Sequence, residues 1–309
     1  MKQIFIATLF LMFINCLSAQ VAILDDSIPS GKNFKKACFR LWYQQETEFI
    51  KGVVVLMPGS NSDGRDWVND TCWQSLAIKN NLALLGCYYT DSLHENMAIE
   101  EYANVKEGSG QALLDVLQKI GKTANHVELS GAPLFLWGIS AGGEFNYEFV
   151  CWKPERVAAF VVNKGGVYYT ALCSPEAREV PGLFFTGEKD LEFRSKIVEG
   201  IYTINRRFGA LWAYVQEPCT EHEIGQSQAL SILFFKDMIR MRIPERETDN
   251  RQSVEFLNIK QEDGYIGDFI LKIYYPFEEY KETSYPTAWL PSRIFAQVWL
   301  QLIKRDCSD

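Results

Sequence analysis

A serine between glycines is the first residue of the sequence that could act as a nucleophile. Ser140 lies in the pentapeptide GISAG (138–142), which follows the apolar run 134–137 and precedes a segment with helical spacing of apolar residues. Small residues around a serine allow a strained strand-to-helix turn that exposes the hydroxyl. The pattern therefore predicts nucleophilic catalysis at Ser140, and a glycine-rich turn with an incidental serine is the alternative.

A serine hydroxyl is a weak nucleophile, so a base must accept its proton. The sequence has three histidines. His94 and His126 precede Ser140 in predicted loops, where a surface or loop-capping role suits them. His222 follows the apolar run 211–215 and precedes a helical segment, and we predict it as the base.

The acid that orients such a base is expected between the nucleophile and the base along the chain. The segment GEKD (187–190) ends the apolar run 182–187, and open α/β sheets place their sites at the carboxyl ends of strands. Asp190 follows the glycine turn at a distance that lets it bend back toward His222, so we predict it as the acid. Glu188 is the alternative, and either carboxylate could instead cap the following helix.

Negative charge on an attacked carbonyl oxygen needs hydrogen-bond donors already in place, typically two backbone N–H groups. One donor of this oxyanion hole is expected from Ala141, directly after the nucleophile at the helix start. The other is expected from the loop PGSNSDG (58–64), where Ser60 or Asn61 is the predicted donor. An ordinary glycine and asparagine turn is the alternative for this loop.

The elements that must position these residues alternate between strands and helices. Apolar runs predict strands over 52–59, 82–89, 133–137, 157–162, 182–187 and 211–215. Helical spacing predicts helices over 113–120 and 191–208, and a closing helix that begins after Ser292. Continuously apolar strands between helices indicate an α/β fold with a mostly parallel sheet and helices on both faces. The alternating segment 36–44 predicts an antiparallel edge strand.

These motifs resemble those of the α/β-hydrolases. The similarity is greatest to the secreted esterases grouped with polyhydroxybutyrate depolymerases and with feruloyl and acetylxylan esterases, and it covers about residues 36–240. It rests on PGSNSDG, GISAGGEF, GEKD and TEHE, in that order. The resemblance implies the α/β-hydrolase fold, with Ser140 acylated, His222 transferring the proton and Asp190 holding the imidazole, and with no metal or organic cofactor.

The C-terminal segment, about 245–309, departs from this pattern. It is rich in aromatic and turn residues and lies outside the minimal fold of that family. Its aromatic side chains either face a ligand over the cleft or pack into the core; those considered are Tyr265, Tyr275, Tyr280 and Trp289. We expect residues 20–309 to form one α/β-hydrolase domain with this segment as its extension.

The charge of the chain argues against two kinds of partner. The 309 residues include 31 basic and 39 acidic side chains, which gives a net charge of −8 without a basic cluster. Nucleic acids and anionic membrane surfaces attract proteins of the opposite charge. We therefore expect neither a nucleic-acid partner nor a membrane-surface partner.

The N-terminus has the order of a secretory signal peptide. Lys2 precedes an apolar block over 4–14, and small residues follow at the predicted cleavage site after Ala19. We predict a signal peptide over 1–19 and a secreted or periplasmic protein without stable membrane insertion. A lipid anchor on Cys16 is the alternative.

Seven cysteines would remain in the mature chain, an odd number, and no pair has metal-site spacing. Cys38, Cys87 and Cys151 lie in apolar surroundings and are predicted to be small core residues. Because an exported chain can form disulfides, a bridge between Cys173 and Cys219 is expected.

The sequence therefore predicts an exported serine carboxylic-ester hydrolase that acts through an acyl-enzyme on ester groups of polysaccharides, of the feruloyl or acetyl type. A depolymerase of short-chain polyesters is the alternative ester hydrolase. A serine peptidase with the same triad and a non-catalytic binding protein on a hydrolase scaffold are the other hypotheses. A thiol enzyme has less support, because no cysteine lies at a comparable turn with a histidine placed to serve it.

Overall fold

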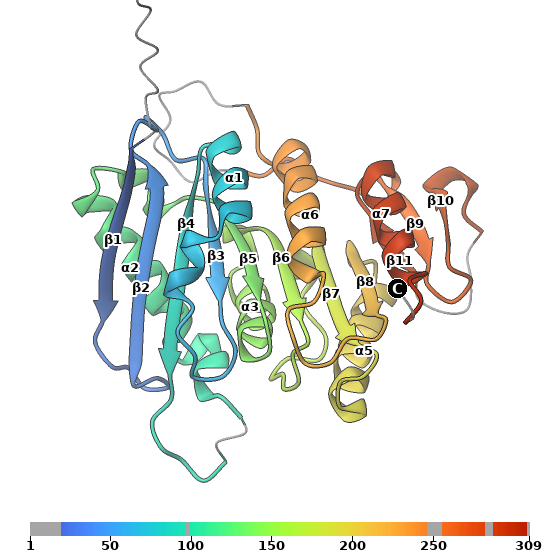
Figure 1. Ribbon diagram of the computed structural model, residues 1–309, viewed down its shortest axis with the longest axis horizontal. Coiled ribbons are helices and arrows are strands. Elements are labelled where there is room, and N and C mark those ends of the chain that lie inside the picture. Colours follow the sequence, from blue (N-terminus) through green and yellow to red (C-terminus); the bar gives the residue numbers. More distant parts are fainter. Residues whose placement is uncertain (1–19, 97–98, 246–254, 282–286, 308–309) are drawn as a thin grey trace, which may run out of the picture.

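The computed structural model describes residues 20–96, 99–245, 255–281 and 287–307 (Figure 1). The predicted signal peptide and Cys16 lie outside these residues. An eight-stranded sheet forms the centre of the molecule. Its strands are β1 (Val21–Ile28), β2 (Lys36–Gln44), β3 (Gly52–Met57), β4 (Leu82–Thr90), β5 (Leu134–Gly138), β6 (Val157–Asn163), β7 (Gly182–Gly187) and β8 (Trp212–Glu217).

The sheet has the order β1-β2-β4-β3-β5-β6-β7-β8 and is mostly parallel. All pairs from β4 to β8 are parallel, whereas β2 pairs antiparallel with β1 and with β4. Every residue of β3, β5, β6 and β7 is buried, because helices cover both faces of a parallel sheet. The predicted α/β fold class and its six apolar strands are confirmed.

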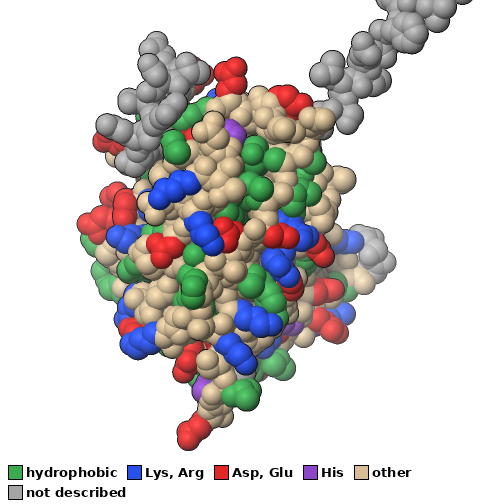
Figure 2. All heavy atoms as spheres, turned by 90° about the vertical axis from the view of Figure 1, so that its left-hand side faces the viewer, with side chains coloured by type: hydrophobic (Ala, Val, Ile, Leu, Met, Phe, Trp, Pro, Cys, Tyr) green, Lys and Arg blue, Asp and Glu red, His purple; other side chains and the backbone are tan. Residues whose placement is uncertain are grey.

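The edge of the sheet differs from the prediction. Segment 36–44 forms β2, which is the second strand, and the edge is β1, which has no counterpart among the predicted strands. β1 is only half-buried, and its two aspartates interrupt the apolar pattern. Asp25 pairs with Arg40, and Asp26 pairs with Lys119 on helix α2 (Ser109–Thr123). Charges along an edge strand disfavour pairing with another chain, and Figure 2 shows basic and acidic side chains interspersed on this side of the molecule.

Helices cover both faces of the sheet (Figure 1). One core cluster joins the sheet to α2 (Ser109–Thr123), α3 (Ala141–Trp152) and α5 (Glu192–Arg207), and the other joins it to α1 (Thr71–Asn80), α6 (Ser227–Arg242) and α7 (Arg293–Ile303). The short helix α4 covers Pro175–Arg178. The 3₁₀ segments are Arg65–Asn69, Glu101–Ala103, Val105–Glu107, Val127–Ser130, Pro154–Arg156, Gln261–Asp263 and Phe277–Glu279. Within the described ranges, no helix is long and apolar enough to cross a bilayer.

Local sequence sets several of these helix ends. The Asp70 carboxylate accepts hydrogen bonds from the N–H groups of Cys72 and Trp73 and so caps α1. Ser292 caps α7 by accepting from the Phe295 N–H, which confirms the predicted start of the closing helix. The helices predicted over 113–120 and 191–208 are present as α2 and α5.

The C-terminal segment forms a small second sheet against the central one. Its strands β9 (Tyr265–Asp268), β10 (Ile273–Pro276) and β11 (Ala288–Leu290) are antiparallel, in the order β10-β9-β11. β11 and α7 contact β8, and the Trp299 indole N–H donates to the Tyr214 carbonyl at 2.8 Å. Trp289 is fully buried, so this aromatic packs into the core.

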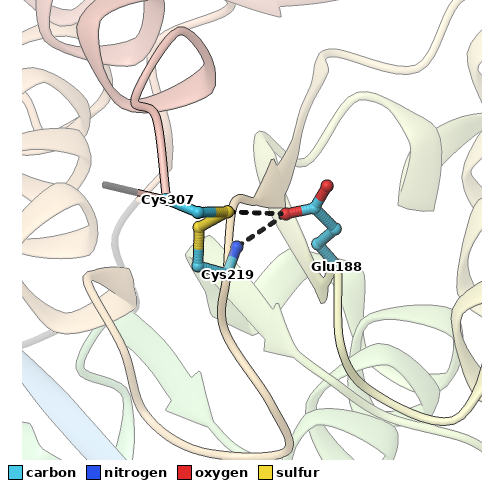
Figure 3. Close-up of side chains that lie close together, drawn as sticks. All are labelled: Glu188, Cys219 and Cys307. Atoms are coloured by element: carbon cyan, nitrogen blue, oxygen red, sulfur yellow. Dashed lines mark hydrogen bonds between the residues drawn. A yellow bond between two sulfur atoms is a disulfide. The ribbon is translucent and has the colours of Figure 1, made fainter. Parts of the chain in front are cut away.

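The expected bridge between Cys173 and Cys219 is wrong. Cys219 forms a disulfide with Cys307, which follows α7 at the end of the chain (Figure 3). Cys173 instead is buried beside Cys151. Spacing along the sequence could not show that the C-terminal segment returns to the loop after β8. Glu188 lies near both bridged sulfurs, but a disulfide offers no thiolate for a metal ion.

Candidate active site

Ser140 occupies a strained turn between β5 and α3. Its backbone has φ 56° and ψ −126°, a region that residues other than glycine rarely adopt. The Ser140 N–H donates to the Asn163 carbonyl at 2.8 Å, and its own carbonyl accepts the N–H groups of Gly143 and Glu144. These three hydrogen bonds fix a backbone that would otherwise relax, so the serine stays at the carboxyl end of the sheet.

The two flanking glycines are required by close backbone approach. A Cβ on Gly142 would lie 2.2 Å from the Met57 carbonyl oxygen at the end of β3. A Cβ on Gly138 would lie 2.4 Å from the Gly142 carbonyl oxygen. Any side chain at either position would push α3 away from the sheet, which explains why the serine is flanked by residues without one.

Asp190 and His222 lie in direct contact. The His222 Nδ1 atom is 2.8 Å from Asp190 Oδ2, and the Asp190 side chain is 2% exposed whereas that of His222 is 31% exposed. The Glu188 carboxylate instead accepts the Cys219 N–H at 2.7 Å (Figure 3). The geometry thus pairs the histidine with Asp190, and Glu188 holds the backbone of the histidine loop.

Several groups keep Asp190 ionised. Burial would raise the pKa of its carboxyl, but hydrogen bonds from His222 and the Leu191 N–H, together with the charges of His222 and Arg194, outweigh burial and lower it. Arg194 Nη1 lies 2.7 Å from Asp190 Oδ1 and 3.0 Å from His222 Nδ1. When Nδ1 carries its proton toward Asp190, Arg194 can donate only to the carboxylate. Asp190 is therefore a carboxylate whose two oxygens each accept a hydrogen bond, Oδ1 from Arg194 and Oδ2 from His222.

The loop after β3 lies against Ser140. A Cβ on Gly59 would be 3.3 Å from the Ser140 Cβ and 3.9 Å from its Oγ, so no side chain at Gly59 separates the loop backbone from the serine. Asn61 adopts φ 50°, and its N–H donates to the Tyr102 hydroxyl at 3.3 Å. Its side-chain oxygen accepts the Asp91 N–H at 2.8 Å, which fixes the loop further.

Asn163 connects the serine turn to the histidine loop. Its carbonyl accepts the Ser140 N–H, and its side-chain amide donates to Ser227 Oγ at 2.7 Å and to the Ile224 carbonyl at 3.3 Å. Ile224 follows His222 by two residues. In the part of the chain that the structure describes, no hydrogen bond joins Ser140 Oγ to His222 directly, and such bonds often close only around substrate.

A buried ion pair lies beneath this connection. Lys164 and Glu217 have side chains that are 0% and 1% exposed, and their charged groups are in contact. The Lys164 ammonium also donates to the Asn163 side-chain oxygen at 3.0 Å, and Glu217 accepts the Gln226 N–H at 2.6 Å. The pair therefore fastens both ends of the histidine loop to β6.

Sequence reasoning missed Arg194, Asn163 and the Lys164–Glu217 pair. A charged residue at the end of a fully apolar strand, as in Lys164 after β6, is the one sequence feature that could have marked the pair. No sequence feature distinguishes Arg194, because an arginine in the first turn of an amphipathic helix is usually a solvated residue.

Comparisons with known proteins identify the fold. No protein-family model matches the sequence, and no curated protein sequence is significantly similar to it. A ferulic acid esterase structure matches with a TM-score of 0.52 at 12% identity, covering 72% of this chain and 98% of that one. S-formylglutathione hydrolase from Staphylococcus aureus matches with a TM-score of 0.51 at 12% identity, covering 72% and 97%. The chain has the α/β-hydrolase fold, as predicted, and similarity at this level establishes no more than the fold.

Proposed function

We propose that the protein is a serine carboxylic-ester hydrolase that works through an acyl-enzyme intermediate. The proposal rests on one observation: Ser140 occupies a strained turn at the carboxyl end of β5, and at the carboxyl ends of the same parallel strands Asp190 contacts His222 Nδ1 at 2.8 Å. A serine, a histidine and a carboxylate in these roles recur on unrelated folds, so the proposal rests on geometry and not on similarity alone.

In the proposed mechanism, Ser140 Oγ attacks the ester carbonyl while His222 Nε2 accepts the hydroxyl proton. Asp190 accepts a hydrogen bond from Nδ1–H, which selects the tautomer with a free Nε2 and stabilises the imidazolium. The alcohol leaves with the proton from His222, and a water activated by the same imidazole then releases the acid. Each step moves one proton between Nε2 and an oxygen, and no cofactor takes part.

The proposed oxyanion hole consists of the N–H groups of Ala141 and Ser60. Ala141 is the first residue of α3, and the first N–H of a helix has no intrahelical acceptor. Of the two candidates on the loop, Asn61 already donates its N–H to the Tyr102 hydroxyl, which favours Ser60. Two preorganised donors of this kind stabilise the developing oxyanion by several kcal/mol, roughly 3 kcal/mol for each.

The substrate class that we favour is an ester on a polysaccharide, of the feruloyl or acetyl type. The name of the matching ferulic acid esterase supports this choice, and so does the predicted export of the chain. A short-chain polyester remains the second ester substrate. A peptidase would use the same residues on an amide, and a non-catalytic binding protein would leave Ser140 unreactive.

A substrate panel tests the proposal with the mature chain, Ser140→Ala and the control Ser130→Ala. Ser130 is exposed on a 3₁₀ segment, and its hydroxyl donates to the neighbouring Val127 carbonyl at 2.8 Å. The panel contains p-nitrophenyl acetate and butyrate, methyl ferulate, acetylated xylan, a 3-hydroxybutyrate oligomer and matched peptide amides. We expect ester turnover in the wild type and the control and none in Ser140→Ala.

Three other results would contradict parts of the proposal. Equal background rates from all three proteins, with no labelling of Ser140 by a fluorophosphonate probe, would favour a binding protein. Faster release of amines than of alcohols would favour a peptidase. Turnover confined to the hydroxybutyrate oligomer would replace the polysaccharide ester by a polyester.

A further inference from the structure

Helix α3 begins directly after Ser140, and side chains on one face of it contact the loop 164–174. Glu144, Glu148 and Cys151 are spaced by four and three residues on α3, which places them in one row. Their partners all lie in the loop 164–174, which leaves β6 beside Asn163. This loop therefore lies between the carboxyl end of the sheet and the α3 surface.

Two of the three attachments are hydrogen bonds to the loop backbone. Glu144 Oε1 accepts the N–H groups of Gly166 and Val167 at 2.7 and 2.9 Å. Glu148 Oε1 accepts the N–H groups of Tyr169 and Thr170 at 2.7 and 2.9 Å, and its Oε2 accepts the Thr170 hydroxyl. Each carboxylate thus supplies the hydrogen-bond acceptor for the backbone N–H groups of two successive loop residues.

The third attachment is a contact between two sulfur atoms. Cys151 Sγ lies 2.9 Å from Cys173 Sγ, and a disulfide requires about 2.05 Å, so a movement of roughly 0.9 Å would close the bond. Cys173 is 3% exposed, and its N–H donates to the Asn205 side-chain oxygen at 2.8 Å. Its carbonyl accepts a hydrogen bond from Arg178. These two hydrogen bonds hold the backbone of Cys173, and Cys151 is a residue of α3, so the fold places the two cysteines side by side before any bond forms.

We propose that Cys151 and Cys173 form a second disulfide, which fastens the loop 164–174 covalently to α3. The bridge between Cys219 and Cys307 fastens the histidine loop after β8, and the proposed one fastens the loop that follows β6. The proposal does not depend on the esterase activity, because it concerns a bond that the fold brings together whatever the substrate is.

The oxidation balances with a disulfide as the oxidant. One thiol loses its proton and attacks a small-molecule disulfide or the disulfide of an oxidoreductase, and the first leaving thiolate takes up a proton. The second cysteine thiolate then displaces the other half, so the oxidant is reduced to two thiols while the cysteine pair loses two electrons. The same class of oxidant forms the Cys219–Cys307 bridge.

Counting free thiols tests the proposal directly. The chain from Gln20 is refolded in a glutathione redox buffer, denatured without reductant, alkylated and weighed by mass spectrometry. This chain has seven cysteines, of which two form the Cys219–Cys307 bridge and two would form the proposed one. We expect three alkylated thiols, and a non-reduced tryptic digest should contain peptide 123–156 linked to peptide 165–178.

Two variants separate the proposed bond from simple burial of the thiols. Cys173→Ser removes one cysteine but frees its partner, so the count should rise from three to four. The control Cys38→Ser removes a cysteine that belongs neither to the Cys219–Cys307 bridge nor to the proposed one, and the count should fall from three to two. Five thiols in the refolded wild type, or a digest that links Cys151 or Cys173 to another cysteine, would overturn the proposal.

Discussion

Replacing Glu144 by glutamine should stabilise the protein at neutral pH and not at acidic pH. Glu144 is 5% exposed, and while Oε1 accepts two N–H groups, Oε2 has no hydrogen-bond partner in the described part of the chain. Burial raises the pKa of this carboxyl to about 7, although the N–H groups of Val167 and Gly166 lower it. The ionised form is therefore costly in the folded state.

The magnitude follows from linkage between protonation and folding. The ordinary pKa of 4.5 applies to the unfolded chain, so between pH 4.5 and about 7 the folded chain keeps a proton that the unfolded chain has lost. The free energy of unfolding consequently falls as pH rises through this window. At 1.36 kcal/mol per pH unit, the loss amounts to ~3 kcal/mol above pH 7.

Glu144→Gln cannot ionise and keeps an oxygen that accepts the two N–H groups. We expect its free energy of unfolding in urea to match the wild type near pH 4 and to exceed it by ~3 kcal/mol at pH 8. Glu148→Gln is the matched control one turn later, where both carboxylate oxygens have partners, and it should be less stable than the wild type at pH 7. Curves for Glu144→Gln and wild type that run parallel from pH 4 to 8 would refute the reasoning.

Three further substitutions test the site and its supports. Asp190→Asn should lower kcat on an ester substrate by about 10⁴-fold, with unchanged circular dichroism, because the histidine loses the carboxylate that selects its tautomer. Lys164→Met should lower the free energy of unfolding in urea by about 3–5 kcal/mol, and adding Glu217→Leu should restore most of it, since the single variant leaves a buried charge unpaired. Cys307→Ser opens a bridge across 88 residues and should cost about 4–5 kcal/mol in oxidising buffer but nothing in reducing buffer, measured by urea unfolding.

The parts of the fold that the sequence predicts are those that local pattern determines. β3, β5, β6 and β7 are buried on both faces, so their residues are apolar throughout and the runs are visible without any partner. β1 escapes prediction because no residue in it is fully buried and two adjacent aspartates, Asp25 and Asp26, interrupt its apolar pattern. An edge strand is defined by the neighbour that it lacks, which is a property of the assembled sheet.

The same distinction separates the site from its supports. Ser140, Asp190 and His222 each follow an apolar run, so chain order and strand ends suffice to select them. Arg194 and Asn163 contact these residues only after α5 and β6 have packed. The residues next to them in the sequence do not indicate these contacts. The Cys219–Cys307 bridge spans 88 residues, a pairing that spacing alone cannot identify.

The bridge also gives the C-terminal extension a connection to the site. Cys219 lies three residues before His222, its N–H donates to Glu188, and its sulfur is bound to the residue that ends the described extension (Figure 3). α7 packs on β8 through Trp299, so Cys307 is held at a fixed place relative to the strand that leads into the histidine loop. The loop is exposed from Glu221 to Gln226, so burial of apolar side chains contributes little to its position. Polar contacts therefore fix its position: Asn163 donates to the Ile224 carbonyl, Asp190 contacts His222, and the disulfide and the Lys164–Glu217 pair restrain its two ends.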